Sequence, residues 1–188
     1  PTDQIVGELQ AFLDKGGFRA VKMRVGSGDG TLRHSIERVR AAREGLGPDI
    51  DIMCDAHGTM TVAEAKRFCR GVADCDIAWF EEPVTADDKP GLAEVRALTD
   101  IPIATGESEF TRFDFRDLIA LRCADILQPD INWVGGMSTC RKIAAMAEAK
   151  DIAVAPHAPL GPINLAASLQ LNFCTPNAIL QETSLGIH

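Results

Sequence analysis

Residues 50–55 (IDIMCD), 77–81 (IAWFE) and 101–107 (IPIATGE) are three short apolar runs that each end in a carboxylate. The acids are Asp55, Glu81 and Glu107, and they follow one another at 81 − 55 = 26 and 107 − 81 = 26 residues. A parallel strand, its crossover helix and two loops take up a comparable length of chain. The constant spacing therefore predicts that each acid lies at the same end of a neighbouring strand.

Three carboxylates that converge on one point repel one another strongly unless a cation lies between them. Ligation by carboxylate oxygens alone favours a hard divalent ion, Mg²⁺ before Zn²⁺. The spacing therefore predicts an Mg²⁺ site formed by Asp55, Glu81 and Glu107, and with it a metal-dependent enzyme. Glu82 adjoins Glu81, but adjacent strand residues face opposite ways, so only one of them can reach the ion. The 26-residue spacing from Asp55 favours Glu81 as the ligand.

Composition restricts the class of protein. The 188 residues suffice for one domain with a large core. The charge balance of 19 − 27 = −8, without a basic block, argues against a nucleic-acid partner. No apolar run approaches the ~18 residues of a membrane span, so no membrane association is expected. The six cysteines form no CxxC pair and lie in apolar segments, which predicts buried thiols in a reducing cytoplasm.

Helical and strand-like segments alternate along the chain, with Gly and Pro at the joints. An amphipathic helix ends at Gly16-Gly17 and is followed by a strand at 18–25. Further helices are expected at 31–46, 61–74, 91–99, 111–121, 136–150 and 161–172. Further strands are expected at 50–55, 77–81, 101–106, 125–129, 152–156 and 177–182. These seven strands are short and almost continuously apolar, as strands buried on both faces are.

Seven βα units without a long excursion predict an α/β fold of the (β/α)₈, or TIM-barrel, type. An open doubly wound sheet is the alternative. Such barrels usually run to about 250 residues. Here no strand precedes the opening helix, and an eighth repeat is absent. We therefore expect residues 1–188 to be a partial barrel domain that lacks its first strand and its last repeat.

Ionisable residues are expected at the carboxyl ends of all the strands, where such barrels carry their chemistry. Lys22 and Arg24 are two residues apart on the first strand, so both face the same side. We expect Lys22 to bind an anionic substrate and to stabilise negative charge. Arg24 cannot act as a base, because arginine is not deprotonated in proteins. A pair of surface cations is the alternative interpretation.

Asp130 and His157 end consecutive strands, 157 − 130 = 27 residues apart, so their side chains should be adjacent. An aspartate bonded to Nδ1 of an imidazole fixes the tautomer and makes Nε2 the basic atom, which is the arrangement of a general base. The alternative is a structural histidine in a proline-flanked turn, APHAP.

Three further residues lie at or close to the strand ends. His57 follows Asp55 by two residues and is a fourth metal ligand, a proton donor, or a loop histidine that caps the turn at 59–61. Glu182 ends the last expected strand, and a carboxyl near other acids can be protonated and donate a hydrogen bond. Glu109 is expected to be solvated.

The ordered set of motifs VKMR, DAHG, WFEEP, TGE, LQPDINWVGG, APH and ILQE resembles the mandelate racemase branch of the enolase superfamily. The resemblance covers nearly the whole chain. Within that branch, DAHG, APHAPLGPINLAA and LQETSLGIH are most similar to sugar-acid dehydratases of the galactonate dehydratase type. Members of the branch usually carry an N-terminal α+β capping domain that closes the barrel mouth, and these residues show no sign of one.

The resemblance implies roles for residues at the strand ends. It implies that Asp55, Glu81 and Glu107 bind Mg²⁺. It also implies that His157, oriented by Asp130, abstracts the proton α to a carboxylate. Building the resulting dianion requires concentrated positive charge, which a divalent ion supplies.

The remaining implied roles concern the substrate, a small sugar acid. Lys22 and Glu182 would contact its carboxylate and the developing enediolate, with Arg24 as a further substrate-binding residue. His57 would protonate the departing 3-hydroxyl. These roles describe a dehydratase that gives a 2-keto-3-deoxy acid. Relatives commonly assemble as homo-oligomers, and we expect the same here.

One departure from the pattern bears on the reaction. Racemases of this branch usually have a second lysine base at the position of Arg24, and Arg24 cannot replace it. One base and one acid histidine therefore favour elimination of water. A racemase, epimerase or cycloisomerase is the second hypothesis, with Lys22 as the other base. A non-catalytic barrel used for binding is the third.

Overall fold

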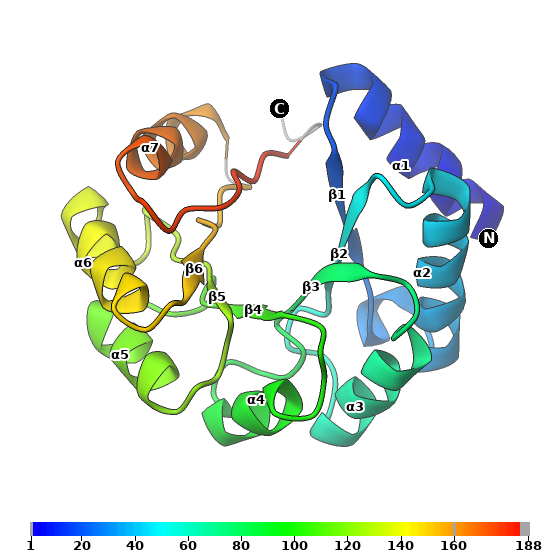
Figure 1. Cartoon of the computed structure of the whole chain (residues 1–188), viewed down its shortest axis with the longest axis horizontal. Coiled ribbons are helices and arrows are strands. Elements are labelled where there is room, and N and C mark those ends of the chain that lie inside the picture. The colour runs from blue at the N-terminus through cyan, green and yellow to red at the C-terminus, as the bar shows by residue number, and fades with distance from the viewer. Residues whose placement is uncertain (1, 160, 185–188) are drawn as a thin grey trace. The chain divides into compact units, whose positions relative to one another are not determined.

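The computed structural model describes residues 2–159 and 161–184. They form two compact units, residues 1–103 and 104–188, which are treated separately below. Helices and strands alternate in both units, as the sequence predicts (Figure 1). Residues 185–188, which complete the LQETSLGIH motif, lie outside the described residues, as does Leu160.

The first unit is a three-stranded parallel sheet, in the order β1-β2-β3, covered by helices on one face (Figure 1). The register aligns Arg24 with Asp55, and Asp55 with Glu81, so these side chains start from the same edge of the sheet. The elements of this unit are α1 (Thr2–Gly16), β1 (Ala20–Arg24), the 3₁₀ helix η1 (Ser27–Asp29), α2 (Leu32–Leu46), β2 (Asp51–Asp55), α3 (Val62–Gly71), β3 (Ile77–Glu81) and α4 (Lys89–Arg96).

Local sequence explains where these elements begin and what they bury. Thr61 caps α3 in a reciprocal capping box with Glu64, so two backbone N–H groups at the helix start are satisfied. Ile52 and Phe80 are fully buried, and the Phe80 ring packs on Phe68 of α3 at 4.7 Å between centroids. The helices therefore take up the outer apolar face of the strands and leave the opposite face to Lys22 and the acids.

The second unit is also a three-stranded parallel sheet, in the order β4-β5-β6. Ala104 aligns with Ile126, and Leu127 aligns with Val154. The elements are β4 (Ile103–Thr105), which begins at the boundary of the units, α5 (Arg112–Ala120), β5 (Ile126–Leu127), α6 (Met137–Glu148), β6 (Ala153–Val154) and α7 (Pro162–Phe173).

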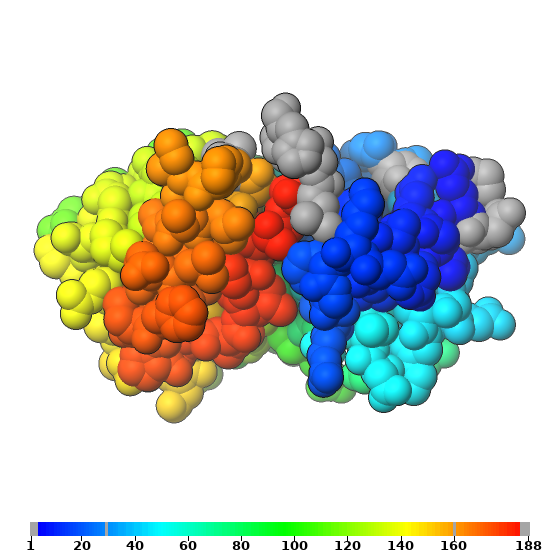
Figure 2. Space-filling view, turned by 90° about the horizontal axis from the view of Figure 1, so that it is seen from above, coloured from blue at the N-terminus to red at the C-terminus, as the bar shows by residue number. Residues whose placement is uncertain are grey.

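Helix α7 exposes apolar residues and buries polar ones. Ile163 and Phe173 are more than four-fifths exposed, and α7 (orange) forms part of the surface in Figure 2. Asn164 and Ser168 are instead buried. The inward polar residues of this helix belong to the candidate site described below.

The strand expected at 177–182 is wrong in extent. Among the described residues, this segment pairs with β6 only through an isolated parallel bridge between Val154 and Ala178. Side chains replace strand pairing next to it: Asn172 Nδ2 donates to the Leu180 carbonyl, and Asn177 Nδ2 donates to the Ile152 carbonyl. The apolar pattern is present, but these local bonds satisfy backbone groups that a longer strand would have used.

Five of the six thiols are buried, as expected, and none of the six forms a disulfide. The exception is Cys174, which lies exposed just after α7 ends. Within the described part of the chain, no helix combines the length and apolarity that crossing a membrane requires.

Candidate functional site

Lys22 lies between two acids at the carboxyl edge of the first unit. Its Nζ is 2.6 Å from Oε1 of Glu81 and 3.9 Å from Oδ2 of Asp55. Glu81 is fully buried and Asp55 is 5% exposed. Buried carboxylates are stable only when they are paired. Two acids that the sequence predicted as metal ligands are therefore neighbours, with a cation already between them.

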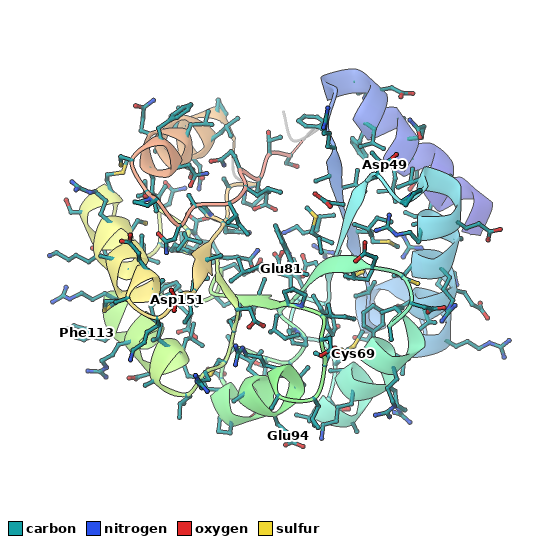
Figure 3. All side chains as sticks on the ribbon, viewed as in Figure 1. Asp49, Cys69, Glu81, Glu94, Phe113 and Asp151 are labelled. Carbon is teal, nitrogen blue, oxygen red and sulfur yellow. The ribbon has the colours of Figure 1, made fainter. Side chains whose placement is uncertain are left out.

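Trp79 is part of this cluster, although the sequence analysis missed it. Its Nε1–H donates a 2.9 Å hydrogen bond to Oε2 of Glu81, and the contact is buried. The available signal was the spacing, because residues two apart on a strand share a face. Figure 3 labels Glu81 on the inner side of β3, away from the helix that carries Cys69.

His57 is held between Asp55 and Arg24. Its Nδ1 lies 2.9 Å from both carboxylate oxygens of Asp55, and its Nε2 lies 3.2 Å from Nη2 of Arg24. Because a guanidinium only donates, Nε2 must accept and Nδ1 must carry the proton. His57 also adopts φ 51°, a left-handed conformation that is uncommon outside glycine, and its backbone N–H donates to Oδ1 of Asp55.

This geometry bears on two of the three roles considered for His57. With the proton on Nδ1, Nε2 has no proton to give and its lone pair is engaged by Arg24. A proton-donor role therefore requires Arg24 to move and Nε2 to take up a proton. The turn-capping role is taken by another residue, since Thr59 Oγ1 donates to the Ala56 carbonyl and accepts from the Ser27 N–H.

The second unit brings Asp130 and His157 together, as their strand spacing predicts. Nδ1 of His157 lies 2.9 Å from Oδ2 of Asp130, and both side chains are buried. Nε2 of the same ring lies 3.4 Å from Oε2 of Glu107. The imidazole is thus oriented by the Asp130 carboxylate, and its Nε2 faces the Glu107 carboxylate.

Asp130 is itself fixed by donors that the sequence analysis missed. Its Oδ1 accepts from the Asn132 backbone N–H at 2.8 Å and from Asn164 Nδ2 at 3.0 Å. Ser168 Oγ in turn donates to Oδ1 of Asn164 at 3.2 Å. The four-residue spacing on α7 could have predicted contact between Asn164 and Ser168, but not contact with Asp130.

The loop that carries Glu107 requires glycine before it. Gly106 has φ 131°, and a Cβ there would lie 2.8 Å from the Phe115 ring. The backbone bends at this point, and Glu107 is 8% exposed. Glu109, expected to be solvated, is instead 5% exposed. Its backbone N–H donates to the Gly106 carbonyl, which closes a turn in this loop.

Glu182 lies close to the base candidate, since its Oε2 accepts from the backbone N–H of Ala158 at 2.8 Å. Two aromatic rings also border His157. The Trp133 ring meets the His157 ring edge-on at 6.3 Å, and Phe110 stacks on Trp133 at 6.0 Å. These rings are partly exposed and give one side of the site an apolar wall.

The family model for the enolase C-terminal domain matches residues 4–188. The chain belongs to the enolase C-terminal domain-like family. The D-galactonate dehydratase of Variovorax paradoxus (strain S110) is 40% identical over 195 residues, which cover 100% of this chain and 50% of the relative. This enolase-family chain therefore spans about half the length of the curated relatives it matches.

Solved structures of the enolase superfamily agree. A member from Polaromonas sp. JS666 matches at a TM-score of 0.93 and 33% identity, over 100% of this chain and 49% of that chain. A racemase from Streptomyces coelicolor A3(2), solved with bound magnesium, matches at 0.88 and 33%, over 98% of this chain and 52% of that chain. These likenesses confirm the expected fold class, an α/β domain of the TIM-barrel type of the enolase superfamily.

Proposed function

We propose that the complete protein is a Mg²⁺-dependent hydro-lyase that removes water from a galactonate-like sugar acid to give a 2-keto-3-deoxy acid. The observation that carries the proposal is the buried Asp130–His157 pair, with His157 Nε2 directed away from Asp130. The 40% identity to a D-galactonate dehydratase over this whole chain supports the choice of substrate class.

The residues present fit a hard divalent cation. In the first unit, the Lys22 ammonium lies within 4 Å of both Asp55 and Glu81, so this pair already requires a positive charge. Asp55, Glu81 and Glu107 would hold the ion, and all three offer oxygen only, the donor that Mg²⁺ prefers. When bound, Mg²⁺ would stabilise the negative charge that develops on the substrate carboxylate.

His157 would remove the proton α to the substrate carboxylate. The C–H electron pair moves into the carboxylate to give an enediolate, and the proton goes to Nε2. Asp130 holds Nδ1–H, which keeps the lone pair on Nε2 and stabilises the imidazolium once it forms. The Trp133 ring, which meets the His157 ring edge-on, would limit the access of water to the imidazole.

His57 would then assist loss of the 3-hydroxyl. The C3–O bond breaks, and the leaving oxygen takes a proton from His57 and departs as water. The remaining enol tautomerises to the 2-keto acid. Because Nε2 of His57 accepts from Arg24 in this structure, Arg24 must first turn to the substrate, which is the binding role expected for it. Nε2 must then take up a proton from solvent, and this is the proton that the leaving oxygen receives.

Lys22 and Glu182 would bind the reacting carboxylate. Lys22 supplies a flexible ammonium from β1, and Glu182 is positioned by the backbone N–H that follows His157. An ammonium stabilises the enediolate more than it stabilises the bound substrate, because the enediolate carries an additional negative charge that develops in the transition state. Removal of the Lys22 side chain should therefore lower kcat as well as raise KM.

A racemase or epimerase of the same superfamily is the second candidate function. The observation in its favour is the 33% identity to the racemase from Streptomyces coelicolor A3(2). Arg24 argues against it, since a two-base mechanism needs a deprotonatable group there. Lys22, which bonds Glu81, would have to act as the second base.

The test uses the complete gene product with Mg²⁺ and a panel of hexonic, pentonic and aldaric acids. The proposal expects a 2-keto-3-deoxy product, detected with semicarbazide, from at least one acid, and no product once the metal is chelated. Inversion at C2 without loss of water would instead establish the racemase. Absence of any reaction across the panel, in a protein that binds Mg²⁺, would favour the non-catalytic barrel.

A further inference from the structure

The two carboxylate oxygens of Glu81 have different partners. Oε1 accepts from Nζ of Lys22 at 2.6 Å, and Oε2 accepts from Nε1 of Trp79 at 2.9 Å. Glu81 has no exposed surface, so these charge-assisted bonds replace the water that the carboxylate loses on burial. A cation that binds the Glu81 carboxylate must therefore either displace each of these donors or bind beside it.

The two donors differ in how readily they can leave. Trp79 is 4% exposed, lies on the same strand two residues before Glu81, and can only donate. Lys22 has a side chain that is 20% exposed and a flexible four-carbon stem. Its ammonium also lies 3.9 Å from Asp55, so it stands where positive charge is already favoured. A cation can displace the lysine, whereas displacing the indole would disturb the packed face of β3.

We propose that Lys22 and the divalent cation compete for Oε1 of Glu81, and that Trp79 is a positioning residue that holds Oε2. This inference rests on the proposed function, since it takes Glu81 as a metal ligand. Metal binding then releases Lys22 from Glu81 and makes its ammonium available to an anionic substrate. Because such coupling is reciprocal, a carboxylate ligand that engages Lys22 raises the affinity for the cation.

The test is calorimetric titration of Mg²⁺ into the complete gene product and its variants. Lys22→Met keeps most of the length of the side chain and removes the competitor, so Mg²⁺ should bind at least about fivefold more tightly. The matched control is Lys66→Met on α3, which makes the same substitution in the same unit but leaves Glu81 paired. Its effect should stay below about twofold, because the Lys66 charge is paired with Glu94 and screened.

Removal of the tryptophan donor should change the Mg²⁺ affinity in the opposite direction. Trp79→Phe keeps an aromatic ring but removes the N–H donor, and Mg²⁺ affinity should fall about tenfold or more. Paramagnetic Mn²⁺ should also quench the part of the tryptophan fluorescence that Trp79→Phe removes, which the difference between the wild type and this variant isolates.

The outcomes separate this inference from the proposed function. If the wild-type protein binds no Mg²⁺, the proposed function fails and the inference fails with it. If the wild-type protein binds Mg²⁺ but Lys22→Met binds it no more tightly than Lys66→Met does, competition is refuted while the metal-dependent enzyme stands. Unchanged affinity in folded Trp79→Phe, or the absence of Mn²⁺ quenching, would refute the role of Trp79.

Discussion

Nδ1 of His157 lies 2.9 Å from Oδ2 of Asp130, and the other oxygen of Asp130 is held by two further donors. The aspartate cannot rotate without losing bonds at both oxygens. The imidazole is therefore fixed both in orientation and in tautomer, with Nε2 as its basic atom. This pair is the feature of the second unit from which the proposed proton transfer follows.

Asp130→Asn should lower α-proton abstraction by about 10²–10⁴-fold with little loss of stability. The amide leaves the ring in place but no longer fixes the proton on Nδ1, so the basic lone pair leaves Nε2. Single-turnover exchange in D₂O measures the effect. Asp151→Asn, on an exposed loop of the same unit (Figure 3), is the control and should exchange at the wild-type rate.

Asn164→Ala should lower kcat about tenfold while KM changes little, because Asn164 acts on Asp130 and does not touch substrate. It should also destabilise the protein by about 1–3 kcal/mol, since Oδ1 of Asp130 loses a buried donor. Steady-state kinetics and urea denaturation measure the two effects. Ser168→Ala, one bond further from Asp130, should have a smaller effect on kcat, and an equal loss would argue against a chain of positioning bonds.

Arg43→Met should destabilise the protein by about 2–4 kcal/mol without changing its metal affinity. The guanidinium donates to four backbone carbonyls, which belong to Gly47, Ile50, Cys75 and Asp76, at 2.7–2.8 Å. It thereby joins the end of α2 to the residues before β2 and β3.

The control for this variant is Arg33→Met on the same helix. Among the described residues, Arg33 pairs only with Glu37 on the exposed surface of the helix, so its loss should barely move the denaturant midpoint. Denaturant midpoints measure both variants. Equal midpoints would show that the four carbonyl bonds contribute no more than a surface pair.

Alkylation at neutral pH should label Cys174 and spare the five buried thiols, as peptide mapping by mass spectrometry will show. Burial raises the pKa of Cys54 and raises the pKa of Cys140 to about 12, which leaves little thiolate at either position. Rapid labelling of Cys54 in the native protein would contradict the burial.

The same buried thiols predict that stability depends on pH. In the unfolded chain Cys54 and Cys140 ionise near pH 9. The free energy of unfolding should therefore decline as pH rises above about 9, because the unfolded state then binds fewer protons than the native state.

The alternation of elements and the strand-end positions of the acids followed from the sequence, because both depend on apolar period and spacing. Asp55 and Glu81 are the last residues of β2 and β3, and Glu107 follows β4 by two residues. Strand extent was less predictable. The segment at 177–182 has the apolar pattern of a strand, but asparagine side chains compete for its backbone, and hydropathy does not record that competition.

The partners within the site could be predicted only in part. Asp130 and His157 followed from the order of the strands. Spacing places Trp79 on the same face as Glu81, but whether the indole bonds the carboxylate depends on the rotamers of both side chains. The bond from Asn164 to Asp130 depends on how α7 faces the strands, which spacing does not predict. Glu109 illustrates the same limit, since it was expected in solvent from its charge but is 5% exposed in a loop whose path the sequence pattern does not predict.

The most direct test of the account is ¹H NMR of the complete gene product with Mg²⁺ and its sugar-acid substrate in D₂O, compared with His157→Asn and His57→Asn. The account predicts a 2-keto-3-deoxy product with deuterium at C3 from the wild type, no exchange at C2 from His157→Asn, and exchange without loss of water from His57→Asn. Dehydration at the wild-type rate by His157→Asn would contradict the assignment of His157 as the base and, with it, the central claim.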